Sequence, residues 1–234
     1  MVIGILQPGY IPWLGFFEQL ARSDVFVLYD DVQYDKHGWR NRNRIKTAAG
    51  AQWLTVPVSV DFSQHPAVNS VRIDSRTDWR RKHLLSIKQN YSQAPFFRDH
   101  IGLFKEAYAR PWEKLVDLDV HLILRLAEAL GLGPKRIVLS SSLGVEGRRV
   151  ERLVAICKNL GADVFYEGAA GRDYMRQSDF EPHGIRLEFQ DYRHPVYRQL
   201  YGEFVPYLSV VDLLFNCGPE SLDILTGRIA GETT

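Results

Sequence analysis

The sequence is poor in the residues that build disulfides and metal sites. It contains two cysteines, Cys157 and Cys217, among 234 residues. They form no CxxC pair and no zinc-type spacing, which argues against a disulfide framework and favours a reducing compartment. The glycine patterns of phosphate-binding loops and dinucleotide-binding folds are also absent. We therefore expect no metal site, and these motifs assign no cofactor.

Neither sign of charge is in excess, and no long apolar run is present. The 29 basic and 28 acidic residues give a formal net charge of +1, so no global field attracts nucleic acid or an acidic membrane. No stretch approaches the roughly 20 apolar residues that a membrane span requires. The N-terminus, MVIGILQPGY, lacks the basic region of a signal peptide. We expect a cytoplasmic protein that binds no nucleic acid.

The order of apolar segments predicts one α/β domain over residues 1–234. Expected strands cover residues 2–6, 24–29, 52–60, 71–73, 137–139 and 164–166. Expected helices cover residues 13–22, 79–91, 96–109, 115–130, 149–160, 205–215 and 221–227. Two strand–helix–strand units favour a mostly parallel sheet with flanking helices, with a helical insertion in the middle of the chain. The opening is Rossmann-like and similar to that of nucleotidyltransferases of the HUP type.

The segment QPGYIPWLGFF, residues 7–17, is the first candidate site. Ligands of parallel sheets bind at the carboxyl ends of strands, where this loop leaves the first strand and enters a helix N-terminus that favours an anion. Gln7 adds a polar group, and Tyr10 and Trp13 add stacking surfaces. The alternative is a rigid hydrophobic corner. The nucleotidyltransferase His-x-Gly-His pair is replaced by residues 13–16, WLGF, which makes adenylyl transfer by that mechanism doubtful.

Asp30 and Asp31 follow the second expected strand. Adjacent carboxylates at a strand end are able to hold a cation, bind hydroxyls or act as bases. Because neighbouring side chains often point apart, we expect one of the two in the site. The alternative is a capped, solvated loop.

Five cationic side chains lie within the eleven residues of 36–46. Arginine recognises phosphate or carboxylate with two parallel hydrogen bonds, and asparagine adds neutral ones. This composition predicts a local site for a nucleotide sugar or a carrier phosphate, although a solvated loop has the same composition. The candidate substrate-binding residues of this segment are Lys36, Arg40, Asn41 and Arg42.

A further strand end opens into a glycine-containing loop at Tyr166, Glu167 and Gly168, with Tyr174 close behind. Glu167 is placed to accept protons from substrate hydroxyl or amine groups. The other three residues are candidates for substrate binding. A structural loop is the alternative.

Two histidines are candidates for a general base. His194 precedes a proline that restricts its backbone, and His83 lies on an expected helix. A structural role is the alternative for both. Asn216 lies four residues after Asp212, so the two share a helical face and brace the site loops. We also count Asn216 among the candidate substrate-binding residues.

Together these segments resemble the WbqC-like protein family. The stretches that carry the resemblance run in order over nearly the whole chain: QPGYIPWLGFF (7–17), DDVQY (30–34), WRNRNRIK (39–46), WLTVPV (53–58), HLLSIKQNY with APFF (83–97), SSSLG (140–144), YEGAAGRDY (166–174) and YLSVVDLLFNCG (207–218).

The resemblance implies a transferase of surface-polysaccharide, O-antigen type, biosynthesis. It would move an aminoacyl group, such as glycyl, to the amine of a nucleotide-linked amino sugar. An aminoacyl thioester on an acyl-carrier protein would be the donor, with His194 or His83 as base and Asp30 or Glu167 orienting the sugar. Two alternatives stay open: an ATP- and Mg-using, adenylate-forming enzyme, and a non-enzymatic nucleotide-sugar binding protein.

Overall fold

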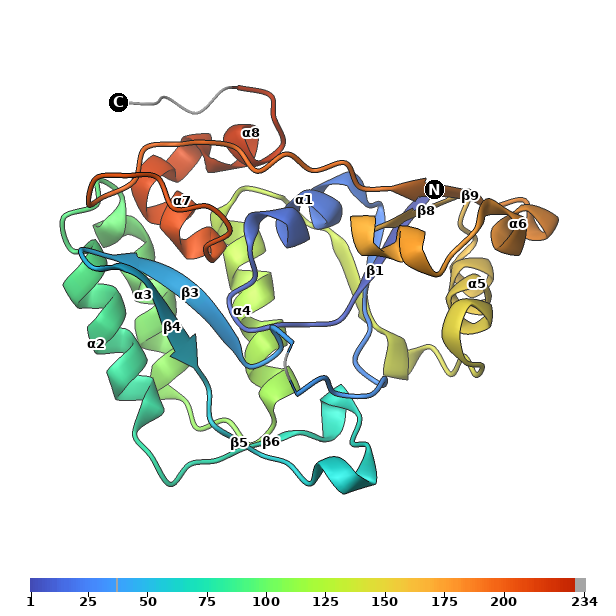
Figure 1. Ribbon diagram of the computed structural model, residues 1–234, viewed down its shortest axis with the longest axis horizontal. Coiled ribbons are helices and arrows are strands. Elements are labelled where there is room, and N and C mark those ends of the chain that lie inside the picture. Colours follow the sequence, from blue (N-terminus) through green and yellow to red (C-terminus); the bar gives the residue numbers. More distant parts are fainter. Residues whose placement is uncertain (37, 230–234) are drawn as a thin grey trace.

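A five-stranded parallel sheet forms the centre of the computed structural model, which describes residues 1–36 and 38–229. The strands lie in the order β7-β2-β1-β8-β9 (Figure 1). Their bounds are Val2–Leu6 (β1), Val25–Leu28 (β2), Arg136–Leu139 (β7), Val164–Glu167 (β8) and Arg186–Phe189 (β9). The α/β, Rossmann-like architecture expected from the sequence is thereby confirmed.

Helices cover both faces of this sheet. Their bounds are Leu14–Arg22 (α1), Trp79–Tyr91 (α2), Phe97–Ala109 (α3), Leu115–Ala129 (α4), Arg149–Leu160 (α5), Gln177–Phe180 (α6), Val210–Cys217 (α7) and Ser221–Leu225 (α8). One core lies between the sheet and the helices α1–α4, α7 and α8, and a smaller one lies under α5 and α6. None of the described helices is long and apolar enough to cross a membrane.

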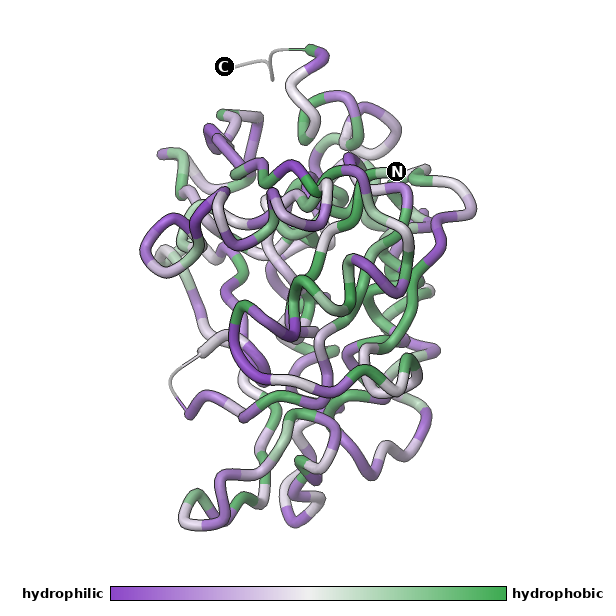
Figure 2. Tube along the Cα trace, turned by 90° about the vertical axis from the view of Figure 1, so that its right-hand side faces the viewer, coloured by the Kyte–Doolittle hydropathy of each residue, from purple (hydrophilic) through white to green (hydrophobic). Residues whose placement is uncertain are grey.

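Strand β2 is apolar at all four positions because both of its faces are covered. Phe26 and Leu28 point into the larger core, whereas Val25 and Val27 point into the smaller one. Figure 2 shows the same arrangement, with hydrophobic segments in the interior and hydrophilic ones mainly in the outer loops. A short continuous apolar run is therefore the correct signature of a central strand here.

The direction in which strands are added reverses at β1. From β1 the chain adds β2 and then β7 on one side, and it later adds β8 and β9 on the other. In open α/β sheets the crevice at such a reversal, beside the carboxyl ends of the strands, is the usual place for a ligand. The loop that leaves β1 at Gln7 lies at this point.

The basic segment is part of a β-hairpin rather than a solvated loop. Arg42–Thr47 (β3) pairs antiparallel with Gly50–Thr55 (β4). The single strand expected over residues 52–60 ends at Thr55, and a separate short pair, Val58–Ser59 (β5) and Arg72–Ile73 (β6), follows after Pro57. A proline lacks the N–H that a continuous ladder needs, which explains the break.

The helix expected from residue 205 begins later, at Val210. Ser209 caps it with a side-chain oxygen that accepts the N–H of Val211. Tyr207, two residues before this cap, has a positive φ of 57°, which is incompatible with an α-helix. Residues 207 and 208 therefore lie outside the helix. Residues 205–209 therefore form a connecting segment that meets the loop after β1.

Asp30 joins the carboxyl ends of β2 and β7. Its carboxylate accepts hydrogen bonds from the hydroxyls of Ser140 (3.0 Å) and Ser141 (2.7 Å), the Ser141 N–H (2.9 Å) and the Asn69 amide (3.3 Å). Asp31 accepts from Ser140 and pairs with Arg152. Because Asp30 is 1% exposed and fully engaged, it is placed to hold the two strand ends together.

We predict that Asp30→Ala lowers the free energy of unfolding by about 2–4 kcal/mol, because it leaves buried donors without their charged acceptor. Asp30→Asn keeps one acceptor oxygen and should cost less. Urea denaturation measures both, with the exposed Asp173→Ala as the control. A stability of Asp30→Ala equal to that of the control would contradict this structural role.

Candidate functional site

A cavity of about 450 Å³ lies beside the carboxyl end of β1. We call it the motif cavity. Its described lining residues are Leu6, Gln7, Gly9, Pro12, Trp13, Phe16, Trp39, Arg40, Asn43, Arg44 and Tyr207. The volume is in the range of small-molecule sites. Of the residues expected to bind substrate, this cavity brings together Gln7, Trp13 and Arg40.

The loop after β1 is fixed against the segment that leads into β3. The Tyr10 N–H donates to the Arg40 carbonyl (2.9 Å). In return, the Arg40 Nη1 donates to the carbonyls of Gln7 (2.8 Å) and Pro8 (3.3 Å). A Cβ at Gly9 would lie 2.8 Å from the Trp39 carbonyl, so a glycine is needed where the two backbones approach.

The segment before α7 closes the other side of the cavity. Trp13 and Ser209 form an antiparallel bridge, and the Val210 N–H donates to the Pro12 carbonyl (2.9 Å). The Ser209 N–H donates to the Arg44 carbonyl (2.9 Å). Three segments that are far apart in the sequence therefore build one wall through backbone hydrogen bonds.

The cavity carries positive charge without a matching carboxylate. Arg40 and Arg44 line it, and its described lining residues include no aspartate or glutamate. Neither arginine forms an ion pair within the described part of the chain, and the Nε of each is buried without a hydrogen-bond partner there. Guanidinium groups in this condition favour an anionic ligand.

Aromatic rings surround the arginines. The guanidinium carbon of Arg44 lies 5.6 Å from the ring centre of Trp39 and 5.7 Å from that of Trp53. The guanidinium carbon of Arg42 lies 4.8 Å from the ring centre of Trp53. Tyr207, 54% exposed, packs on Trp13 at the cavity rim. These contacts hold the guanidinium planes in place and leave planar surface at the rim for a ring of the ligand.

His194 lies behind this rim rather than in the cavity lining. Its Nδ1–H donates to the Pro195 carbonyl (2.8 Å), and its Nε2 accepts the Tyr207 N–H (3.2 Å). Burial lowers the pKa of His194, which favours the neutral ring that both bonds require. To act as a base, the imidazole would have to give up its bond to Tyr207.

The sequence predicts that Tyr10 provides a stacking surface and that His83 is a candidate base. Both residues lie in the core instead. Tyr10 is fully buried, and its hydroxyl is hydrogen-bonded to the His83 Nδ1 (2.8 Å) and to the Tyr108 hydroxyl. Burial lowers the pKa of His83 to about 4. These residues brace the loop from beneath and do not line the motif cavity.

The other expected residues are spread over several places. Lys36 is exposed, with its Nζ over the Phe62 ring, and His37 lies outside the described residues. The Asn41 amide donates to the Val56 carbonyl (2.9 Å). The Asn216 amide is buried and donates to the Asp212 carbonyl (2.7 Å) within α7, so it does not line the motif cavity.

Glu167 and its neighbours lie at the carboxyl end of β8. Burial raises the pKa of Glu167 to about 8, although the Gly168 N–H donates to its carboxylate (3.0 Å). Tyr174 is 59% exposed, and Glu167 contributes to raising its pKa. The Tyr166 hydroxyl donates to Glu18. At neutral pH Glu167 is mainly protonated, which suits a hydrogen-bond donor better than a base.

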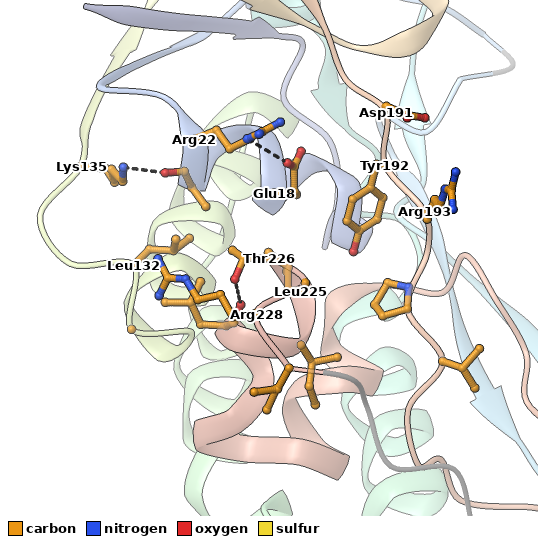
Figure 3. A pocket seen from close by; sticks show the side chains of 18 residues that line it. Glu18, Arg22, Leu132, Lys135, Asp191, Tyr192, Arg193, Leu225, Thr226 and Arg228 are labelled. Carbon is orange, nitrogen blue, oxygen red and sulfur yellow. Dashed lines mark hydrogen bonds and ion pairs between the residues drawn. The ribbon is translucent and has the colours of Figure 1, made fainter.

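A second cavity, of about 1010 Å³, lies along the C-terminal half of α1 (Figure 3). Glu18 pairs with Arg22 there, and the Lys135 ammonium donates to the carbonyls of Ala21 (2.8 Å) and Ser23 (2.9 Å). These side chains are mostly engaged in holding the fold, and no residue expected in the site lines this cavity. The motif cavity is therefore the stronger candidate.

The candidate substrate-binding residues from the sequence do not include Asn43, Arg44, Trp39 or Tyr207, all of which line the motif cavity. The alternation in WRNRNRIK is a signal for two of them, Asn43 and Arg44, because in a strand Arg42 and Arg44 point to one side and Asn43 to the other. Asn43 donates to the Ile11 carbonyl (2.8 Å) and supports the loop. Tyr207 has no comparable local signal, since long-range contacts place it.

We predict a pH-dependent effect of Glu167→Gln. The folded pKa of Glu167 is raised, so its contribution to stability is present below its ordinary pKa of 4.5 and is lost as pH rises through about 8. The free energy of unfolding of the variant should equal that of the native protein at acidic pH. At alkaline pH it should exceed the native value by on the order of 4 kcal/mol. Unfolding midpoints across pH test this, with the exposed Glu181→Gln as control; parallel curves for native protein and variant would contradict it.

Comparison with known proteins shows the family of the chain. No solved structure matches the chain. An uncharacterized protein of Mycobacterium tuberculosis, Rv1507c, is 37% identical over 225 residues, which cover 95% of this chain and 96% of that protein. The pattern of the WbqC-like protein family matches residues 7–224, which include the loop after β1, the β3–β4 hairpin and α7. The chain belongs to the WbqC-like protein family.

Proposed function

We propose that this protein transfers an aminoacyl group, such as glycyl, to the amine of a nucleotide-linked amino sugar during surface-polysaccharide biosynthesis of the O-antigen type. The observation that carries the proposal is the pair of arginines in the motif cavity, Arg40 and Arg44, each without an ion pair in the described chain. A diphosphate linkage would satisfy both guanidinium groups with charge-assisted hydrogen bonds.

The rim of the motif cavity supports a ligand that is both anionic and cyclic. Trp13, Trp39 and Tyr207 line the cavity around the two arginines. Planar side chains of this kind stack on nucleobases and on the apolar faces of sugar rings. The nucleotide then lies with its phosphates at Arg40 and Arg44 and a ring against the rim.

In the chemical step, the amine nitrogen attacks the carbonyl carbon of an aminoacyl thioester on an acyl-carrier protein. The new carbon–nitrogen bond forms the amide, the carbon–sulfur bond breaks, and the proton lost by the amine ends on the thiolate. His194 is the candidate base because its ring lies against Tyr207 of the rim, and it would accept the proton at Nε2 after releasing the Tyr207 N–H. The proposal gives His83 and Asp30 structural roles, because hydrogen bonds hold both in buried networks.

Two other functions draw on particular observations. Non-enzymatic binding of a nucleotide sugar is favoured by the lining of the motif cavity, whose described residues include no carboxylate or imidazole. Formation of an adenylate from ATP and Mg is favoured by the strand order and by the loop that leads from β1 into α1. Amide product from a thioester donor would reject the first alternative, and ATP–pyrophosphate exchange with an amino acid would support the second.

We expect Arg44→Ala to weaken the binding of UDP-linked amino sugars by about 10- to 100-fold, as the loss of one charge-assisted interaction of about 1.5–3 kcal/mol implies. Affinity in the native protein should also fall as salt is added. Calorimetric titration measures both, with Arg98→Ala, an exposed arginine of α3, as the matched control. Equal affinities in the two variants would remove Arg44 from the site.

A further inference from the structure

Asp119 of α4 is an unusual carboxylate. It is 0% exposed, and both of its oxygens are buried without a hydrogen-bond partner among the described residues. Buried carboxylates normally accept several hydrogen bonds, because an ionised group without partners is costly in a protein interior. The negative charge of the Asp119 carboxylate must therefore be offset by a nearby positive charge or neutralised by a bound proton. The carboxylate is also able to change from one of these states to the other.

The compensating charge is that of Arg40. The Arg40 guanidinium lowers the pKa of Asp119, against a larger increase caused by burial. Burial lowers the pKa of Arg40, and Asp119, Asp35 and Tyr34 act in the opposite direction. Arg40 also lines the motif cavity, where its Nη1 is engaged by the loop carbonyls and its Nε has no partner in the described chain. The same guanidinium therefore interacts electrostatically with a buried carboxylate and also lines the space for an anion.

The other titratable groups around this carboxylate do not change their protonation state in the neutral pH range. Burial raises the pKa of Tyr10, from the loop after β1, and of Tyr34, from the loop after β2, to about 12 for Tyr34, and Asp119 adds to both increases. Both therefore stay neutral.

Behind Tyr10 lie His83 of α2 and Tyr108 of α3. The pKa of His83 is lowered to about 4 and that of Tyr108 is raised, so both stay neutral as well. On α4 itself, Asp117 and His121 are not among the groups that shift Asp119, and Asp35 and Arg42 act on Tyr34.

We propose that binding of an anion in the motif cavity is coupled to protonation of Asp119, because the anion and the Asp119 carboxylate compete for the single guanidinium of Arg40. The inference rests on the proposed function in one respect, the presence of an anionic ligand at Arg40. It adds a positioning residue that does not line the cavity and a proton that enters with the ligand.

The direction of the coupling follows from the charges. An anion at Arg40 offsets the positive charge that keeps Asp119 ionised, so the bound state holds a proton more tightly than the free state. Affinity for the anion therefore falls as pH rises. One coupled proton limits the fall to tenfold in the dissociation constant for each unit of pH.

Sulfate is a suitable probe because it keeps its charge throughout the neutral range and does not depend on which nucleotide the cavity accepts. Trp13 and Trp39 line the cavity, so tryptophan fluorescence reports its binding. We expect sulfate affinity of the native protein to fall by up to tenfold per pH unit over part of the range from about pH 5 to about pH 9. Asp119→Asn should bind sulfate with little pH dependence and more tightly than the native protein at high pH.

Asp117→Asn is the matched control, because it removes an exposed carboxylate from the same helix and should keep the native pH profile. The same pH profile in the native protein and in Asp119→Asn would overturn the coupling while leaving the anion site in place. No response to sulfate in either protein at any pH would overturn the anion site, and with it both the coupling and the proposed function.

A double-mutant cycle tests the partnership of Asp119 and Arg40 without a ligand. Arg40→Met should lower the urea midpoint more in the native background than in Asp119→Asn, because it leaves a buried carboxylate without its counter-charge. Additive effects of the two substitutions would overturn the partnership. The cycle still tests this partnership if Asp119→Asn destabilises the protein, because the interaction energy between the two residues is obtained from the stabilities of the variants.

Discussion

The hydrogen bonds of Arg40 are the interaction on which the candidate site depends. Its backbone carbonyl accepts from Tyr10, and its guanidinium donates to the carbonyls of Gln7 and Pro8. The loop that leaves the sheet at β1 is thus held by a residue from another part of the chain. The same side chain supplies positive charge to the cavity, so the shape and the charge of the site are set by one residue.

Around this contact the polar residues divide into two groups. Asp30 and His83 take part in buried hydrogen bonds that connect separate segments, and Asn216 donates to a carbonyl within α7. Arg44 instead has a buried Nε without a partner in the described chain, next to open space. A polar group that the fold leaves unsatisfied is a stronger indication of a ligand than one that completes an internal network, because leaving it unpaired carries a cost.

The neutral composition of the chain conceals this local charge. A net charge of +1 gives no attraction for polyanions over the whole surface, yet the motif cavity places Arg40 and Arg44 together without a carboxylate in its described lining. Asp119, which acts on Arg40 but does not line the cavity, is fully buried, and burial raises its pKa above the ordinary value. An anion in the motif cavity and the Asp119 carboxylate therefore act on the same guanidinium.

The sequence by itself determined the parallel sheet, most of the helix bounds and the place of the loop after β1, because apolar periodicity and the carboxyl ends of parallel strands are local properties. It also named Gln7, Trp13 and Arg40 among the candidate substrate-binding residues, and these three line the motif cavity. Tertiary structure decided that Tyr10 is buried under the loop, that residues 42–47 form a strand, and that Tyr207 and Asp119 belong to the same region. Those outcomes depend on contacts between residues far apart in the chain, and no local pattern encodes which of several polar side chains will be left facing a cavity.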